Sequence, residues 1–127
     1  MLSVITELRV DEPARFNPEK LEDLCHRIGD AQAETEVALA LDRIAAMLNA
    51  LPSLSVRAHV PDLRDAVEVL ISDAELIGMA TLARVARNVV DCIERGNLVA
   101  IAATLARLER VGDRSIHAVW DLEDMSV

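Results

Sequence analysis

Apolar residues recur along this chain at alternating intervals of four and three, which is the spacing of a helix face packed against other helices. In the segment 31–50 and just beyond it, the series is Val37, Leu41, Ile44, Leu48 and Leu51. In the segment 62–77 it is Leu63, Val67, Leu70, Ala74 and Ile77. Segments 79–95 and 98–122 carry similar series, which run from Leu82 to Ile93 and from Ile101 to Leu122. The pattern predicts four helices, each with one buried face.

A further helix is predicted before these four. Asn17-Pro18 indicates its start, because Asn is a good N-cap and Pro suits the first helical turn. Gly29 can close this helix, although Gly29-Asp30 can also be a kink, with Asp30 capping the next helix. Residues 1–16 are predicted to form an N-terminal arm or a brief strand.

Turn signals separate the later helices. Pro52-Ser53 predicts the end of the second helix and a loop up to Pro61. Gly78 and Gly96 predict two further stops. Short connections force neighbouring helices to be antiparallel. The expected fold is therefore all-α, an up-and-down antiparallel four-helix bundle over residues 17–127 with an extra N-terminal helix or arm.

Composition narrows the partners that such a bundle can bind. Of the 127 residues, 52% are hydrophobic but only 2% are aromatic, so the core must be aliphatic. The 22 acidic and 13 basic residues give a net charge of −9, which repels polyanions and predicts no nucleic-acid or membrane partner. No signal peptide or apolar stretch of about 18 residues is apparent. Two distant cysteines predict no disulfide, and the chain is expected to be cytoplasmic.

The search for catalytic motifs is negative. The sequence has no glycine-rich phosphate loop, no nucleophile elbow and no HExxH. Glu22 and His26 lie four residues apart beside Cys25, but a lone pair of this kind is a weak metal signal. Cys25 and Cys92 fall at apolar positions and are expected to be small buried side chains. The sequence predicts no enzyme, no metal and no cofactor.

A family pattern is present in the second half of the chain. Residues 63–78 read LRDAVEVLISDAELIG, followed by Leu82, an acidic position at Asp91 or Glu94, and Gly96-Asn97. In these features the segment 63–108 resembles a histidine-phosphotransfer (HPt) domain, whose helix has the form L-R-x-A-x-H-x-L-K-G-[SA]-A-x-x-[LI]-G. The apolar and glycine positions fall in register without a gap.

The residues that carry phosphotransfer in that family are replaced here. Glu68 stands at the place of the phosphoaccepting histidine, Ile71 at that of the lysine, and Ser72 at that of the following glycine. The resemblance therefore implies a docking scaffold without its phosphoacceptor. One alternative keeps the transfer chemistry and moves it to His26, beside Arg27.

Helical spacing places Arg64, Glu68, Ile71, Ser72 and Glu75 on one face of the third bundle helix. The resemblance implies that this face binds a response-regulator receiver domain or a histidine kinase, so that the protein modulates a two-component phosphorelay without being an enzyme. Alternatively, Ile71 packs against another helix or a dimer mate, and the charges only solvate the surface. A second hypothesis is a homodimeric structural or assembly protein, joined through the apolar run 67–71.

Overall fold

The computed structural model describes residues 16–57 and 60–125, and this part of the chain is all-helical, as predicted. Its helices are α2 (Pro18–Ile28), α3 (Asp30–Arg57), α4 (Val60–Leu76), α5 (Ala80–Arg95) and α6 (Leu98–Met125). No strand occurs within these ranges, where the one β-bridge joins Phe16 to Met79. The arm predicted for 1–16 lies outside the described residues except for Phe16.

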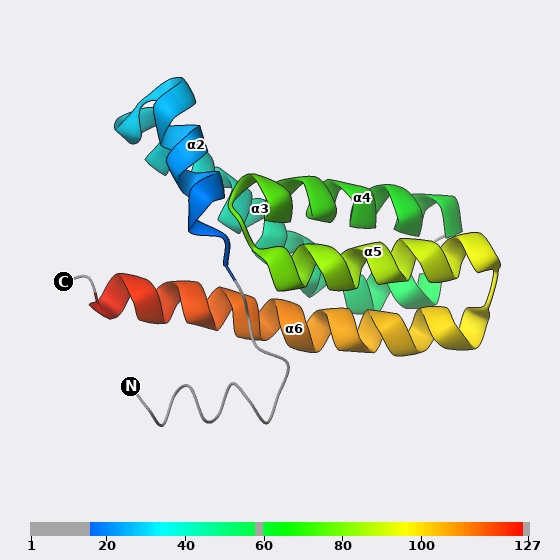
Figure 1. Ribbon diagram of the computed structural model, residues 1–127. Helices are drawn as coiled ribbons and strands as arrows, with labels where there is room; N and C mark the ends of the chain where they lie inside the picture. The colour runs from blue at the N-terminus through cyan, green and yellow to red at the C-terminus, as the bar shows by residue number, and fades with distance from the viewer. Residues whose placement is uncertain (1–15, 58–59, 126–127) are drawn as a thin grey trace.

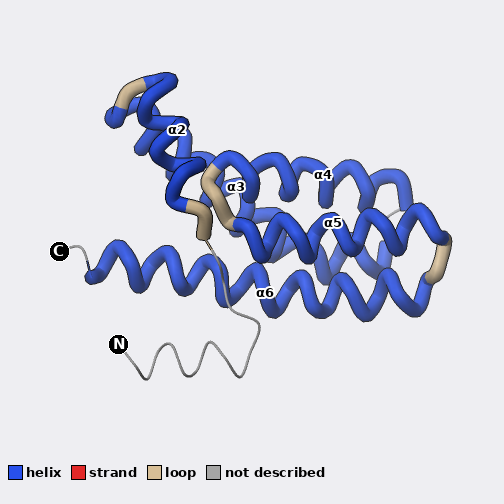
Figure 2. Tube along the Cα trace, in the orientation of Figure 1, coloured by secondary structure: helices blue, strands red, loops and turns tan. Residues whose placement is uncertain are grey.

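Four of the helices lie side by side and surround the core. In Figure 1, α3, α4, α5 and α6 run alternately in opposite directions, and Figure 2 shows the short turns that join α4 to α5 and α5 to α6. Each helix contacts the next, and α3 also contacts α6, so the contacts form a closed circuit. Helix α2 lies at one end, against α3 and α4.

The core is aliphatic, and its predicted positions are confirmed best in α4 and α5. All five predicted positions in and just after α4 are buried, as are Leu82, Val85, Val89 and Ile93 of α5. The prediction for α3 is only half right: Ile44 and Leu51 are fully buried, whereas Val37, Leu41 and Leu48 are half-buried. Alanines at 33 and 40 occupy the buried positions instead, because a small side chain lets helices approach closely.

The predicted helix caps are confirmed. The Asn17 side-chain oxygen accepts a hydrogen bond from the Glu19 amide at 3.1 Å, and Asn97 does the same for Ala100 at 3.1 Å. Gly29 has a φ of 85° and separates α2 from α3, so the first helix ends there and does not continue through a kink.

The prediction that Pro52 ends the second helix is wrong. Helix α3 continues through Pro52 to Arg57 and α4 begins at Val60, so residues 53–57 and 60–61 of the expected loop are helical. Proline lacks a backbone N–H and disfavours a helix interior. Here Leu51 is buried and Leu54 is half-buried against the core on either side of it, so tertiary packing outweighs the local cost.

Helix α3 contradicts the prediction that the chain has no apolar stretch long enough to span a membrane. Among the described residues, it is the one helix long and apolar enough to cross a membrane by length and composition, over Asp30–Leu54 with a mean hydropathy of 1.4. No such stretch was expected from the sequence. A mostly buried core helix of a soluble protein passes the same test, whereas only 17% of this stretch is buried, although α3 contacts three other helices.

The turn between α4 and α5 is held against the start of α2. The Asn17 amide donates to the Gly78 carbonyl at 2.7 Å, and Gly78 has a φ of 77°. A Cβ at position 78 would lie 2.4 Å from the Asn17 carbonyl oxygen. This contact therefore requires glycine both for its conformation and for its lack of a side chain.

Gly78→Ala should destabilise the fold much more than Gly96→Ala. Both glycines have positive φ, but nothing lies within 4 Å of a Cβ at Gly96. Gly96→Ala should lower the free energy of unfolding by about 1–2 kcal/mol, the cost of a left-handed non-glycine residue. Gly78→Ala adds a steric clash of about 1–3 kcal/mol. Urea denaturation measures both, and equal losses would contradict the packing role of Gly78.

Candidate docking surface

The five residues singled out in the sequence lie along α4 on the side that faces α5. Glu68, Ser72, Arg64 and Glu75 are exposed, whereas Ile71 is half-buried and packs against the core. The alternative that Ile71 packs against another helix is thus partly correct. Val69 of the same helix is 51% exposed.

A shallow surface hollow of about 380 Å³ is lined by both α4 and α5. Its lining comes from both helices: Glu68, Ile71 and Ser72 of α4, and Arg87, Val90 and Asp91 of α5. Ile71 and Val90 are half-buried and supply the apolar part, while the other residues form a polar rim. An apolar floor with a charged rim is the composition of a small protein-binding surface.

Ion pairs between α4 and α5 border the hollow at both ends. At one end, a terminal nitrogen of Arg64 lies 2.7 Å from Glu94, and its Nε lies 3.5 Å from Glu68. At the other end, Arg87 pairs with Glu75. These side chains are about half exposed, and such pairs contribute only about 0.2–1 kcal/mol each to stability. Their main effect is to orient the charges around the hollow.

The α5 wall was not recognised as part of the surface from the sequence. Arg87, Val90, Asp91 and Glu94 recur at three- and four-residue intervals, so they share a helix face. That spacing marks a face but does not show that it lies opposite Glu68. The pairing of Arg64 with Glu94, thirty residues apart, could be identified only from the structure.

The opposite side of α4 is fixed by a charged pair with α3. Asp73 is only 8% exposed, and its carboxylate accepts hydrogen bonds from Arg43 at 2.9–3.2 Å. This hydrogen bonding, together with the negative charge of Asp73, raises the pKa of the Arg43 guanidinium above its ordinary value. The pair joins α4 to α3 through a side chain that lies five residues from Glu68.

The thiol of Cys25 is not activated. It is half-buried, as is Cys92, so neither cysteine has the full burial that the sequence suggested. Partial desolvation raises the pKa of the Cys25 thiol, and the nearby carboxylates of Asp30 and Glu22 raise it further. A reactive cysteine needs the reverse, an electropositive neighbourhood that stabilises thiolate.

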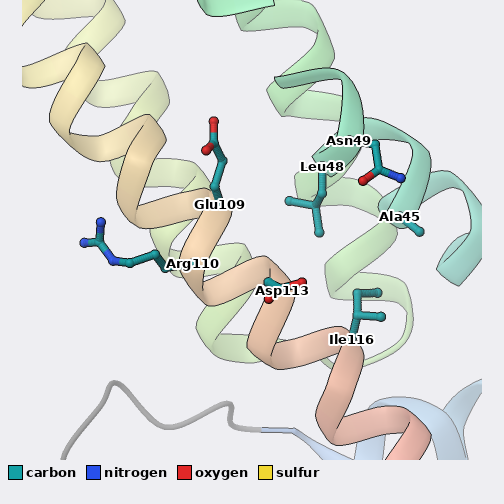
Figure 3. Close-up of a pocket in the computed structure, with 7 residues that line it drawn as sticks. All are labelled: Ala45, Leu48, Asn49, Glu109, Arg110, Asp113 and Ile116. Atoms are coloured by element: carbon teal, nitrogen blue, oxygen red, sulfur yellow. The ribbon is translucent and has the colours of Figure 1, made fainter. Parts of the chain in front are cut away.

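A second groove, between α3 and α6, carries polar groups that do not converge. Its lining is Ala45, Leu48, Asn49, Glu109, Arg110, Asp113 and Ile116. In Figure 3, Arg110 points away from α3, on which Asn49 lies.

Across the described ranges, no three His, Cys, Asp or Glu side chains gather as metal ligands. Comparisons with protein-family models, curated proteins and solved structures gave no match to this chain.

Arg43→Gln should lower the urea midpoint of unfolding more than Arg110→Gln does. The first change leaves the Asp73 carboxylate buried without its cation, which is costly. Arg110 is exposed and makes no ion pair among the described residues, so it is a matched control. Similar midpoints for the two variants would show that the Arg43–Asp73 pair does not hold α3 to α4.

Cys25 should react with iodoacetamide more slowly than free cysteine at neutral pH. Its raised pKa leaves less thiolate, the reacting species. The rate should climb only at alkaline pH, as the thiol ionises. Mass spectrometry of the Cys92→Ala variant over a pH series measures this, and rapid alkylation at pH 7 would show that Cys25 is activated.

Proposed function

We propose that this chain is a non-enzymatic docking protein of the HPt type. In this proposal, α3–α6 form an up-and-down four-helix bundle with α2 as an addition, and the hollow between α4 and α5 binds a receiver domain or a histidine kinase. Binding would occupy the partner's surface and so modulate a two-component phosphorelay. A receiver domain is the more specific candidate, because the HPt face implied by the resemblance meets that domain.

The observation that carries the proposal is the position of Glu68. This exposed carboxylate lies midway along α4, at the rim of the hollow floored by Ile71 and Val90. Residue by residue, it occupies the place of the phosphoaccepting histidine in the family that the segment resembles. The position of Glu68 therefore lies on the same face of α4 as the hollow and its charged rim.

The charges around Glu68 favour binding over phosphoryl transfer. An incoming phosphoryl group needs a cation to offset its negative charge. Arg64 is 3.5 Å from Glu68 but only 2.7 Å from Glu94, and Arg87 pairs with Glu75. Both arginines beside the hollow are thus engaged by carboxylates, and Ile71 stands where the family has lysine.

His26, the alternative phosphoacceptor, gains little support. It is exposed on α2, and it lines neither the hollow between α4 and α5 nor the neighbouring hollow between α2 and α4.

Homodimeric assembly is a second candidate function. Its interface would not be the apolar run 67–71 that the sequence suggested. Val67 and Leu70 of that run are at most 1% exposed in their own core. Leu98 and Val99, at the start of α6, are instead 73% and 81% exposed. Leu98 also lines an apolar groove with Leu54, Val60 and Leu63. This apolar end favours self-association more than the α4 run does.

Glu68→Lys should abolish binding to a receiver domain that the native protein binds. Reversing the charge at the rim places a cation beside Arg64 and changes the complementarity of the face. Asp65→Lys is the matched control, because Asp65 is exposed on the same helix and lines neither hollow. Isothermal titration with each purified receiver domain and each histidine kinase of the source genome measures the affinities.

Loss of binding by both variants would point to net charge and not to this face. Binding by neither variant nor the native protein would contradict the docking function. Sedimentation equilibrium of the same native sample then decides the second candidate, because a dimer that dissociates on Leu98→Asp would identify the apolar end as its interface.

A further inference from the structure

The groove between α3 and α6 has an apolar floor that is partly exposed to solvent. Its volume is about 440 Å³, and the floor consists of Ala45 and Leu48 of α3 and Ile116 of α6, all half-buried. Figure 3 shows Leu48 and Ile116 pointing into the space between the two helices. Leu41, also half-buried, continues the floor along α3, because residues seven apart share a helix face.

The groove lies on the surface and accounts for part of the incomplete burial of α3. Only 17% of the most apolar stretch of α3 is buried, despite its mean hydropathy of 1.4. The two helices meet closely beneath the floor, since a Cβ on Gly112 would lie 2.5 Å from Leu48 Cδ2. Below that contact, Ile44 and Leu108 are fully buried. The groove therefore does not open into the core.

Carboxylates outnumber cations along the edges of the groove. Glu109 and Asp113 line it from α6, and Asp42 is exposed on the α3 edge, three residues before Ala45 on the same helix face. The one basic residue in the lining is Arg110, which points away from α3 in Figure 3. Three carboxylates therefore stand against one arginine that is turned outward.

Neighbouring basic residues do not offset these carboxylates at the groove. Arg43, the one basic residue of α3 before its last position, is bound to Asp73 of α4. Arg107 and Arg114 lie two and five residues from Glu109, which places both on the far side of α6. The ring of His117 lies 3.8 Å from the Asp113 carboxylate, but it is a cation only when protonated.

We propose that this groove binds an amphipathic helix of another protein, which carries apolar residues along one face and Lys or Arg beside them. Apolar side chains at positions i, i+3 or i+4, and i+7 of such a helix extend over two turns, as the floor does between Leu41 and Leu48. The basic residues of the bound helix then meet carboxylates at both edges of the groove.

This binding site is distinct from the hollow proposed to bind a receiver domain or a histidine kinase. The groove lies between α3 and α6, whereas the hollow is lined by α4 and α5. In the closed circuit of helix contacts, these two pairs of neighbours share no helix. The inference therefore goes beyond the proposed function and does not depend on it.

Other occupants match the charge of the groove less well. A second copy would bring a further net charge of −9 to a groove with acidic edges. Anionic membranes and nucleic acids are repelled for the same reason. Residues 1–15 contain three carboxylates and two arginines, so this segment of the chain offers no excess of positive side chains. A helix rich in Lys or Arg offers both the apolar face and the positive charge.

The probe is a fluorescein-labelled peptide of leucine and lysine, about 18 residues or five helical turns long, with leucines at alternating intervals of three and four. One control peptide has the same composition in a scrambled order, so it has no apolar face. Another has glutamate in place of each lysine. Fluorescence anisotropy measures the affinity of each peptide for the full chain at low salt and in about 0.5 M salt.

Two pairs of variants locate the binding site. Ala45→Arg places a long cationic side chain over the floor, whereas Ala46→Arg makes the same change at an exposed position that does not line the groove. Glu109→Lys/Asp113→Lys reverses the charge of the α6 edge. Its control, Glu22→Lys/Asp65→Lys, reverses two exposed carboxylates outside the groove with the same change in net charge. Circular dichroism checks that every variant keeps its helix content.

The native protein should bind the amphipathic peptide at least about tenfold more tightly than the scrambled one, and it should not bind the glutamate peptide. Ala45→Arg should weaken binding about tenfold relative to Ala46→Arg. At low salt, Glu109→Lys/Asp113→Lys should weaken binding about tenfold relative to its control. That second difference should shrink in about 0.5 M salt, where charges are screened within a few ångströms.

Equal affinity for the amphipathic and scrambled peptides would overturn the proposal, because it would show only a general attraction of cations to an acidic chain. Equal binding by Ala45→Arg and Ala46→Arg would also overturn it. Displacement of the probe by a synthetic peptide of residues 1–15 would assign the groove to the chain's own segment. A native dimer that Ala45→Arg dissociates in sedimentation equilibrium would assign it to a second copy, and co-sedimentation with neutral lipid vesicles would assign it to a membrane.

Discussion

The arrangement of the α2 side of the molecule depends on one backbone contact, in which the Asn17 amide donates to the Gly78 carbonyl. Only Gly29 lies between α2 and α3 in the chain, and α2 also packs against α3 and α4, with Leu24 buried. The Gly78 contact holds the other end of α2, and the bridge between Phe16 and Met79 extends it. The backbone contact and the helix packing together fix α2, and the contact requires the absence of a side chain at position 78.

Helix α4 is the element on which the candidate surface is built, and different interactions hold each of its sides. Its apolar series is buried in the core, Asp73 binds Arg43 of α3, and Ile71 packs beside α5. Full burial of one such aliphatic side chain contributes about 1.5–3 kcal/mol, whereas an exposed ion pair contributes about 0.2–1 kcal/mol. Core packing therefore fixes α4, and the surface pairs only arrange the charges around Glu68 and Ser72.

The sequence was informative where structure depends on neighbours in the chain. The spacing of Leu63, Val67 and Leu70 identified the buried face of α4, and the caps at Asn17 and Asn97 marked real helix starts. It failed where distant residues decide the outcome. The continuation of α3 through Pro52 depends on core contacts made by Leu51 and Leu54. The α5 wall of the hollow and the place of α2 beside Ser72 likewise depend on packing between segments far apart, which periodicity does not encode.

Under the docking proposal, Glu68 stands where the HPt family has histidine, and this difference changes the electrostatics of the face as well as its chemistry. A neutral imidazole gains negative charge only when it is phosphorylated, whereas an exposed carboxylate is charged at neutral pH without modification. This face would thus keep a constant negative charge at the hollow, beside the engaged arginines of α4 and α5. A partner would meet alternating charges in a fixed order, and such a pattern selects among related domains by charge position more than by total charge.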